Sequence, residues 1–178
     1  MSASAPLTVL SRSLDQLGDL LVHVNADDLD GPTPCSDWTL GQLVDHVVAA
    51  PTKFAVMVRG EQPDWSARPP HLDEGWAAEF RSSADDLMQL WQQGSAPEGS
   101  SPDWQTAEFA VHTWDLANAL GRSTGDLDPD VAEQGLAFMK ANLRDEMRGE
   151  VFGPEQPAPT DGDAYDAIAA FAGRTVAP

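Results

Sequence analysis

Apolar residues recur at helical spacing along most of the chain, and this periodicity restricts the fold more than any other feature. Between residues 7 and 25 they stand three or four positions apart, at Leu7, Leu10, Leu14, Leu17, Leu21 and Val24. That spacing places them on one face of an α-helix. We expect further helices at about 39–60, 73–93, 102–120, 129–148 and 164–172. No segment alternates apolar and polar residues as a half-buried strand does, so we predict an all-α protein.

Proline and glycine separate the expected helices, with loops at 26–34, 63–70 and 94–101. Thr39 followed by Gln42 has the form of a capping box at the start of the second helix. Gly121 suits the position just beyond the end of the fourth helix. Long helices joined by loops are typical of a bundle, and 178 residues are enough for one well-packed domain over 1–178.

Three residues on two of these helices have the chemistry of a metal site. Glu108 and His112 stand four residues apart, so their side chains share one helix face. His46 lies beside the apolar stripe of the second helix. Two imidazoles and a carboxylate suit zinc or a nickel-like divalent ion, and three protein ligands leave a position open, as in catalytic zinc sites. A solvated Glu108–His112 pair with a core histidine at 46 explains the spacing alone at least as well.

The surroundings of these residues favour the metal. Glu108 shares its face with Trp104, Val111 and Asp115, which is a mostly nonpolar environment for a carboxylate. A buried carboxylate needs a cation, and a buried histidine needs partners for its ring nitrogens. A metal would satisfy all three groups, whereas an ion pair would satisfy only part of the set.

Two neighbouring residues have less certain roles on sequence grounds. Asp115 follows His112 by three residues and is a candidate to hold the far ring nitrogen of that ligand, as partners behind metal-bound histidines do. A structural hydrogen bond to another helix is the alternative. Cys35 is the single cysteine, so no internal disulfide can form. It is a candidate nucleophile, but we interpret it as a small packing residue.

Composition excludes some classes of function. A net charge of −19 repels nucleic acid and anionic membranes, so neither is an expected partner. No run of apolar residues is long enough for a transmembrane helix, and the N-terminus lacks the pattern of a secretory signal. We therefore expect a cytoplasmic protein, and we leave a homodimer open.

Four stretches of the chain stand out as motifs: residues 32–48 (PTPCSDWTLGQLVDHVV), 107–121 (AEFAVHTWDLANALG), 152–159 (FGPEQPAP) and 169–174 (AAFAGR). In their sequence and order they resemble a family of metal-binding proteins common in actinobacteria. The wider group is the DinB-like superfamily, which includes mycothiol-dependent maleylpyruvate isomerase. This resemblance implies a four-helix bundle with short extra C-terminal helices and a divalent metal held by His46, Glu108 and His112.

The resemblance also implies chemistry with a low-molecular-weight thiol. The expected function is a divalent-metal-dependent enzyme that uses a thiol cofactor such as mycothiol on an electrophilic substrate, as an isomerase or S-transferase. The alternative is a non-catalytic protein that binds a metal or small ligand. The maleylpyruvate isomerase carries a further C-terminal domain that we expect to be absent here, so we do not expect that particular isomerase activity.

Overall fold

The structure is a computed structural model that describes residues 5–35, 37–149 and 152–177, and in that part of the chain it contains helices and no strand. The predicted all-α class is therefore confirmed. No helix among these residues is both long and apolar enough to cross a membrane. In chain order the helices are α1 (Ala5–Leu21), α2 (Leu40–Val58), α3 (Trp76–Gln92), α4 (Asp103–Ala119), α5 (Pro129–Asn142) and α6 (Ala164–Phe171), with single 3₁₀ turns at Ala26–Asp28 and Asp145–Met147.

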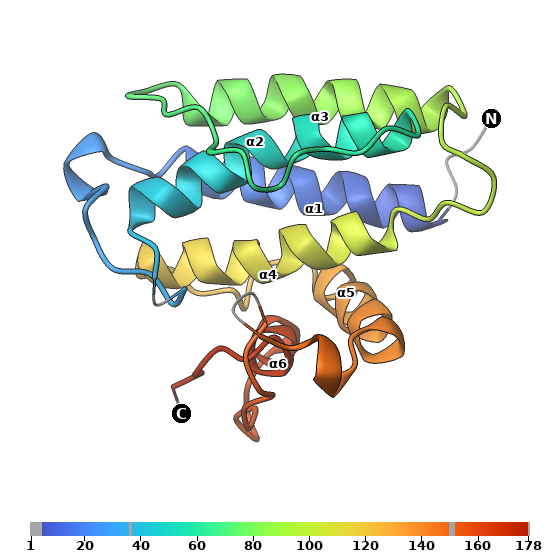
Figure 1. Ribbon diagram of the computed structural model, residues 1–178. Helices are drawn as coiled ribbons and strands as arrows, with labels where there is room; N and C mark the ends of the chain where they lie inside the picture. The colour runs from blue at the N-terminus through green and yellow to red at the C-terminus, as the bar shows by residue number, and fades with distance from the viewer. Residues whose placement is uncertain (1–4, 36, 150–151, 178) are drawn as a thin grey trace.

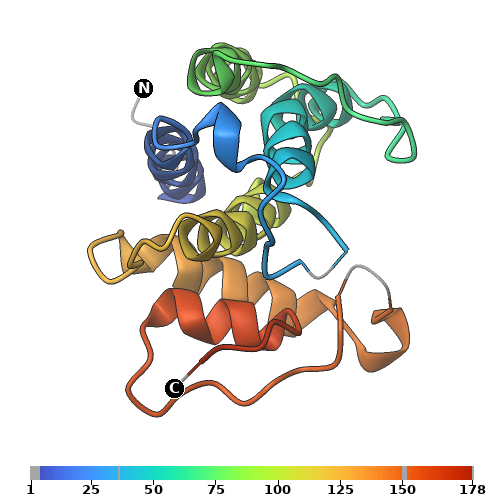
Figure 2. The ribbon, with the colours of Figure 1, turned by 90° about the vertical axis from the view of Figure 1, so that its left-hand side faces the viewer.

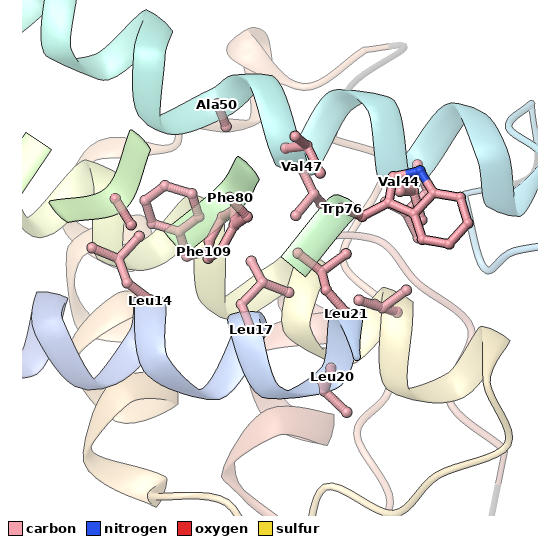
Figure 3. Packing of buried hydrophobic residues seen from close by; sticks show 14 of the residues in the cluster. Leu14, Leu17, Leu20, Leu21, Val44, Val47, Ala50, Trp76, Phe80 and Phe109 are labelled. Carbon is pink, nitrogen blue, oxygen red and sulfur yellow. The ribbon is translucent and has the colours of Figure 1, made fainter. Parts of the chain in front are cut away.

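The four long helices α1–α4 lie side by side and form a bundle (Figure 1). α1 packs against α3 and α4, and α2 packs against the same two helices, so the bundle closes on itself. Its interior is filled by side chains from all four helices (Figure 3). Leu17 of α1, Val47 of α2, Phe80 of α3 and Phe109 of α4 are each almost completely buried.

Helices α5 and α6 form a second layer that runs crosswise beneath the bundle and covers α4 (Figure 2). This layer has its own apolar core, which includes Val131, Tyr165 and Ile168. α4 is consequently enclosed on both sides, and nearly every residue from Gln105 to Ala117 is buried. A helix buried all round must place its polar side chains inside the protein, where each needs a partner.

The predicted helix boundaries are right at some ends and wrong at others. The capping box of Thr39 and Gln42 is present, and Gly121 has the left-handed φ of 64° expected just beyond α4. The first helix was expected to reach Asn25, but it ends at Leu21 in a tighter turn. The fifth was expected to reach Arg148 but ends at Asn142, because Leu143 adopts an extended backbone.

Gly135 is the point of closest approach between α5 and the rest of the molecule. A Cβ atom at this position would lie 2.9 Å from Cδ1 of Ile168 and 3.0 Å from the backbone Cα of Ala107. Both distances are shorter than ordinary carbon–carbon contacts, and one of the two atoms belongs to backbone that cannot rotate away. Glycine at 135 therefore allows α5 to pack directly on α4.

We predict that Gly135→Val lowers the free energy of unfolding by about 1–3 kcal/mol, because the added side chain overpacks the contact between α4 and α5. Urea unfolding followed by circular dichroism measures this change. Ala137→Val, on the exposed side of the same helix, is the matched control and should change stability by less than about 1 kcal/mol. Equal stability of the two variants would contradict the close approach.

Candidate metal centre

The packing of α2 against α4 brings together the three residues that the sequence singles out. His46 lies near the middle of α2, and Glu108 and His112 lie one turn apart on α4. Nε2 of His46 is 3.0 Å from Oε1 of Glu108, and Nε2 of His112 is 3.2 Å from the same oxygen. Two imidazoles from different helices therefore converge on one carboxylate oxygen.

These side chains fit a divalent ion in both chemistry and placement. Each offers one ligand atom, and the three atoms lie within 4.8 Å of one another. Two imidazole nitrogens and one carboxylate oxygen are a donor set that zinc and its neighbours accept. The side chains are only 20% (His46), 15% (Glu108) and 9% (His112) exposed, so little water competes for the ligand atoms.

Burial and charge act in opposite directions on the protonation of Glu108 and His112. Burial by itself would raise the pKa of Glu108, but the charge and hydrogen bonds of His112 and His46 hold that pKa well below its ordinary value. Burial would lower the pKa of His112, but Glu108 and the hydrogen bond to Asp115 raise it well above its ordinary value. The site is thus built around an ionised carboxylate that attracts positive charge.

Trp38 covers the two histidine rings from the loop that precedes α2. Its ring centroid lies 4.8 Å from that of His46 and 6.1 Å from that of His112, and the second pair is stacked. A large aromatic ring at this position restricts the orientations that the imidazoles can take. The indole therefore helps to hold both Nε2 atoms toward Glu108.

A second carboxylate, Asp115, lies behind His112. It is fully buried, and its Oδ2 is 3.0 Å from Nδ1 of His112. A proton on Nδ1 donated to this carboxylate leaves Nε2 as the nitrogen whose lone pair is available to a bound ion. Asp115 therefore lies behind the imidazole and away from the candidate ligand atoms.

Arg174 pairs with Asp115 from the far end of the chain. Its Nε donates to Oδ1 at 3.1 Å, and its Nη2 donates to Oδ2 at 2.9 Å. Such a two-point contact fits the planar guanidinium to the carboxylate. Although burial alone would raise the pKa of Asp115, hydrogen bonds from His112 and Arg174 lower it to about 2. Asp115 is therefore ionised across the physiological range.

The end of α6 delivers Arg174 to this position. Gly173 has a φ of 92°, and the backbone N–H groups of Gly173 and Arg174 close the helix by donating to the carbonyls of Ala170 and Ala169. A Cβ at 173 would lie 2.7 Å from the backbone of Gly153. The glycine thus provides both the left-handed turn and the close approach of two chain segments beside the site.

Our sequence interpretation of Cys35 as a packing residue is wrong, because its thiol makes polar contacts. Its Sγ donates to Oδ2 of Asp115 at 3.1 Å and lies 3.5 Å from Nη2 of Arg174. It also lines the cavity in front of the histidines. The thiol is therefore part of the polar surroundings of Asp115 rather than of the apolar core.

A cavity of about 530 Å³ lies in front of the three candidate ligands. Trp38 and the candidate ligands form one side of it, and Phe152, Gly153 and Arg174 from the C-terminal part form the other. A volume of this size suits a small molecule. The arrangement can therefore admit a ligand directly to the donor atoms.

The other two histidines, and the cations Lys53 and Arg59, are not among the candidate ligands. His71 contacts Asp45, and His23 accepts from Arg122, both at the surface and outside the ligand cluster. Arg59 is exposed at the end of α2. Lys53 lies over the ring of Trp65 at 5.4 Å and lines a different cavity beside His46.

Sequence reasoning missed Arg174 as a residue of the site. Its partner Asp115 is 59 residues away, and no periodic pattern connects the two. The available signal was chemical: a buried Asp115 next to a histidine needs a cation, and Arg174 directly follows the glycine that ends the last helix.

Comparison with known proteins identifies the family. The model of the mycothiol maleylpyruvate isomerase N-terminal domain matches residues 10–117. The chain belongs to this family. It is also 34% identical to uncharacterized proteins from two strains of Mycobacterium tuberculosis, over 96% of this chain and 98% of theirs. No solved structure gave a significant match. The family match covers α1–α4 almost entirely, including all three candidate ligands, whereas Arg174 lies beyond it.

We predict about one zinc- or nickel-like divalent ion per chain in protein purified without a histidine tag, because the donor set suits those ions. Elemental analysis by mass spectrometry measures it. His46→Ala and His112→Ala should each abolish binding, whereas His71→Ala should retain the metal, because His71 faces Asp45 on the surface. Full occupancy in the double variant His46→Ala, His112→Ala would refute the assignment.

We predict that Arg174→Leu lowers the free energy of unfolding at neutral pH by roughly 3–5 kcal/mol, because it leaves the carboxylate of Asp115 buried without its cation. Arg12→Leu is the matched control. Arg12 pairs with Asp128 at the surface and is 46% exposed, so its loss should cost under about 1 kcal/mol. A loss for Arg174→Leu no greater than that for Arg12→Leu would show that the buried pair adds nothing to stability.

The Asp115–Arg174 pair also predicts how the difference in free energy of unfolding between wild type and Arg174→Leu depends on pH. The pKa of Asp115 falls from 3.8 to about 2 on folding, so its contribution is present above pH 4 and is lost as the pH falls toward 2. Without Arg174 the folded-state pKa is higher, and less of this contribution exists to be lost. Urea titrations at a series of pH values should show the gap between wild type and Arg174→Leu narrowing below about pH 4. A constant gap would contradict this account.

Proposed function

We propose that this protein is a divalent-metal-dependent enzyme that acts with a low-molecular-weight thiol cofactor, as an isomerase or an S-transferase. The observation that carries the proposal is the set of two imidazoles and one carboxylate that faces a cavity of about 530 Å³. Membership of a family named for a mycothiol-dependent isomerase supports a thiol, with mycothiol as the first choice. Zinc suits the donor set best, and nickel is the second choice.

His46, Glu108 and His112 would hold the ion. Bound there, a divalent ion would supply a Lewis acid that lowers the pKa of a coordinating thiol and favours the reactive thiolate. Asp115 keeps the proton of His112 on Nδ1, so that Nε2 is available as a ligand atom. Arg174 keeps Asp115 ionised and in place. Trp38 excludes water from one side of the rings.

A second cavity, which we call the polar cavity, adjoins the site on the other side of His46. It has a volume of about 990 Å³ and shares Trp38 and His46 with the cavity in front of the ligands. Its wall carries hydrogen-bonding and charged side chains, among them Gln42, Asp45, Lys53, Arg68 and His71. We place the polar body of the thiol cofactor here, because many donors and acceptors surround a site that opens next to the candidate ligands.

The reaction needs the thiol and one electrophilic carbon compound. The sulfur forms a bond to carbon; in an isomerase that bond breaks again and regenerates the thiol, whereas in an S-transferase a leaving group departs with the bonding electrons. Neither course requires an oxidant or a reductant. The proposal includes a cytoplasmic setting, where low-molecular-weight thiols stay reduced. The net charge of −19 supports small-molecule partners over nucleic acid or anionic membranes.

We predict that cobalt-substituted protein develops a thiolate-to-metal absorption band when mycothiol or N-acetylcysteine is added. The donor set leaves a position for an external sulfur, and the low dielectric of a mostly buried site strengthens its attraction to the ion. Ultraviolet–visible titration measures the band and its dependence on thiol concentration. Glu108→Gln should weaken metal binding and the band together, because it removes the ligand charge.

Cys35→Ser is the essential control. Cys35, His112 and Asp115 form a second cluster of potential ligands, so the protein's own thiol could contribute a sulfur signal. We expect Cys35→Ser to retain the thiol-dependent band, because the cofactor supplies the sulfur. Absence of a band in wild type at saturating thiol would overturn the thiol-dependent function and favour a non-catalytic metal- or ligand-binding protein.

A further inference from the structure

An apolar groove, which shares no described lining residue with the polar cavity, lies beside the candidate metal centre. It has a volume of about 290 Å³ between the first half of α4, the end of α5 and the segment that follows α5. Side chains from all three parts form its walls, chiefly Trp104, Ala107, Phe138, Met139, Leu143 and Met147. Among the described residues that line it, Glu108 is the single ionisable one.

The groove adjoins the cavity in front of the candidate ligands. Glu108 and Phe152 line both spaces. A molecule seated in the groove would therefore have one end beside the carboxylate that binds both imidazoles. A separate apolar depression elsewhere on the surface would have no such connection to the donor atoms.

Two large apolar side chains that line the groove are exposed to solvent. Trp104 is 40% exposed and Met147 is 62% exposed, and they are two of the four large apolar residues in the described chain with high exposure. An apolar patch with polar surroundings marks an interaction site more often than a chance arrangement. Methionines and an aromatic ring adapt their shape to an apolar ligand, which suits a binding surface.

We infer that this groove binds the apolar part of the second substrate, an uncharged aryl or alkyl group, with the reactive carbon directed toward Glu108. The volume is of the order that accepts one or two rings, since a dry cavity of roughly 150 Å³ already binds benzene. That the bound molecule is a substrate rests on the proposed function, whereas the existence of the apolar binding site does not. The thiol cofactor and the electrophile then reach the centre through different spaces, one beside His46 and the other beside Glu108.

The neutral fluorescent probe N-phenyl-1-naphthylamine tests the groove in the full-length protein, both as purified and after chelation of metal. Saturable binding with about one site per chain is expected in both states, because Glu108 is the one candidate metal ligand among the described residues that line the groove. Met147→Glu places a charge in the groove at an exposed position and should weaken probe binding at least about tenfold. Circular dichroism verifies that the variant is folded.

Val22→Glu is the matched control, because Val22 is 58% exposed but does not line the groove, and it should bind the probe like wild type. Equal probe affinity of Met147→Glu and wild type, or no saturable binding by wild type, would overturn the inference. A wild-type dimer that Met147→Glu converts to monomer in sedimentation velocity would instead assign the groove to a second copy of the chain, and would also overturn it.

The two proposals fail in different ways. The probe titration contains no thiol, so its outcome is independent of the cobalt–thiol band. Probe binding without a thiolate band would leave an apolar ligand site in a protein that is not thiol-dependent. A thiolate band without probe binding would leave a thiol-dependent enzyme whose electrophile binds elsewhere.

Discussion

Burying the carboxylate of Glu108 is the constraint on which the rest of the site depends. A carboxylate removed from water is costly unless cationic groups surround it, and here two imidazoles from different helices contact one oxygen at 3.0 and 3.2 Å. α2 must therefore pack on α4 in the register that places His46 opposite Glu108. The buried leucines, valines and phenylalanines of the bundle supply the favourable free energy for that packing, so the fold does not rely on the site for its formation.

The same need for a partner of opposite charge extends from Glu108 through a row in which acidic and basic side chains alternate. Glu108 attracts His112, His112 contacts Asp115, and Asp115 is paired with Arg174. Every side chain in this row is mostly buried, so each one needs its neighbour as a hydrogen-bond partner. A buried ion pair of this kind contributes more to a fixed geometry than to net stability, because desolvation offsets much of the attraction. We interpret the row as the device that fixes the ring orientation of His112.

The features that could be predicted from the sequence are those that depend on residues close together in the chain. The helices are visible because apolar spacing is local, and Glu108 with His112 is visible because one helical turn separates them. His46 could be added because its position on an apolar face demanded a partner. Cys35 and Arg174 could not, because their contacts with Asp115 span 80 and 59 residues and depend on how the α6 end meets the loop before α2. The early end of α5 at Asn142 was missed for a related reason: the segment after it turns away to line the groove beside Glu108.

The candidate ligands and one wall of the apolar groove come from different parts of the chain, which affects which molecule can bind. All three candidate ligands lie within residues 10–117, the part that the family model matches. Phe138, Met139, Leu143 and Met147, which form one wall of the apolar groove, all lie beyond it. The ligand atoms determine which ions can bind, and the walls around them determine which molecule can approach the ion. Under the proposed function, changes in α5 and the segment that follows would alter which molecule binds without altering the three candidate ligands. In this chain that part of the wall is apolar, and the wall beside His46 is polar, so the two sides of the centre select for different chemistry.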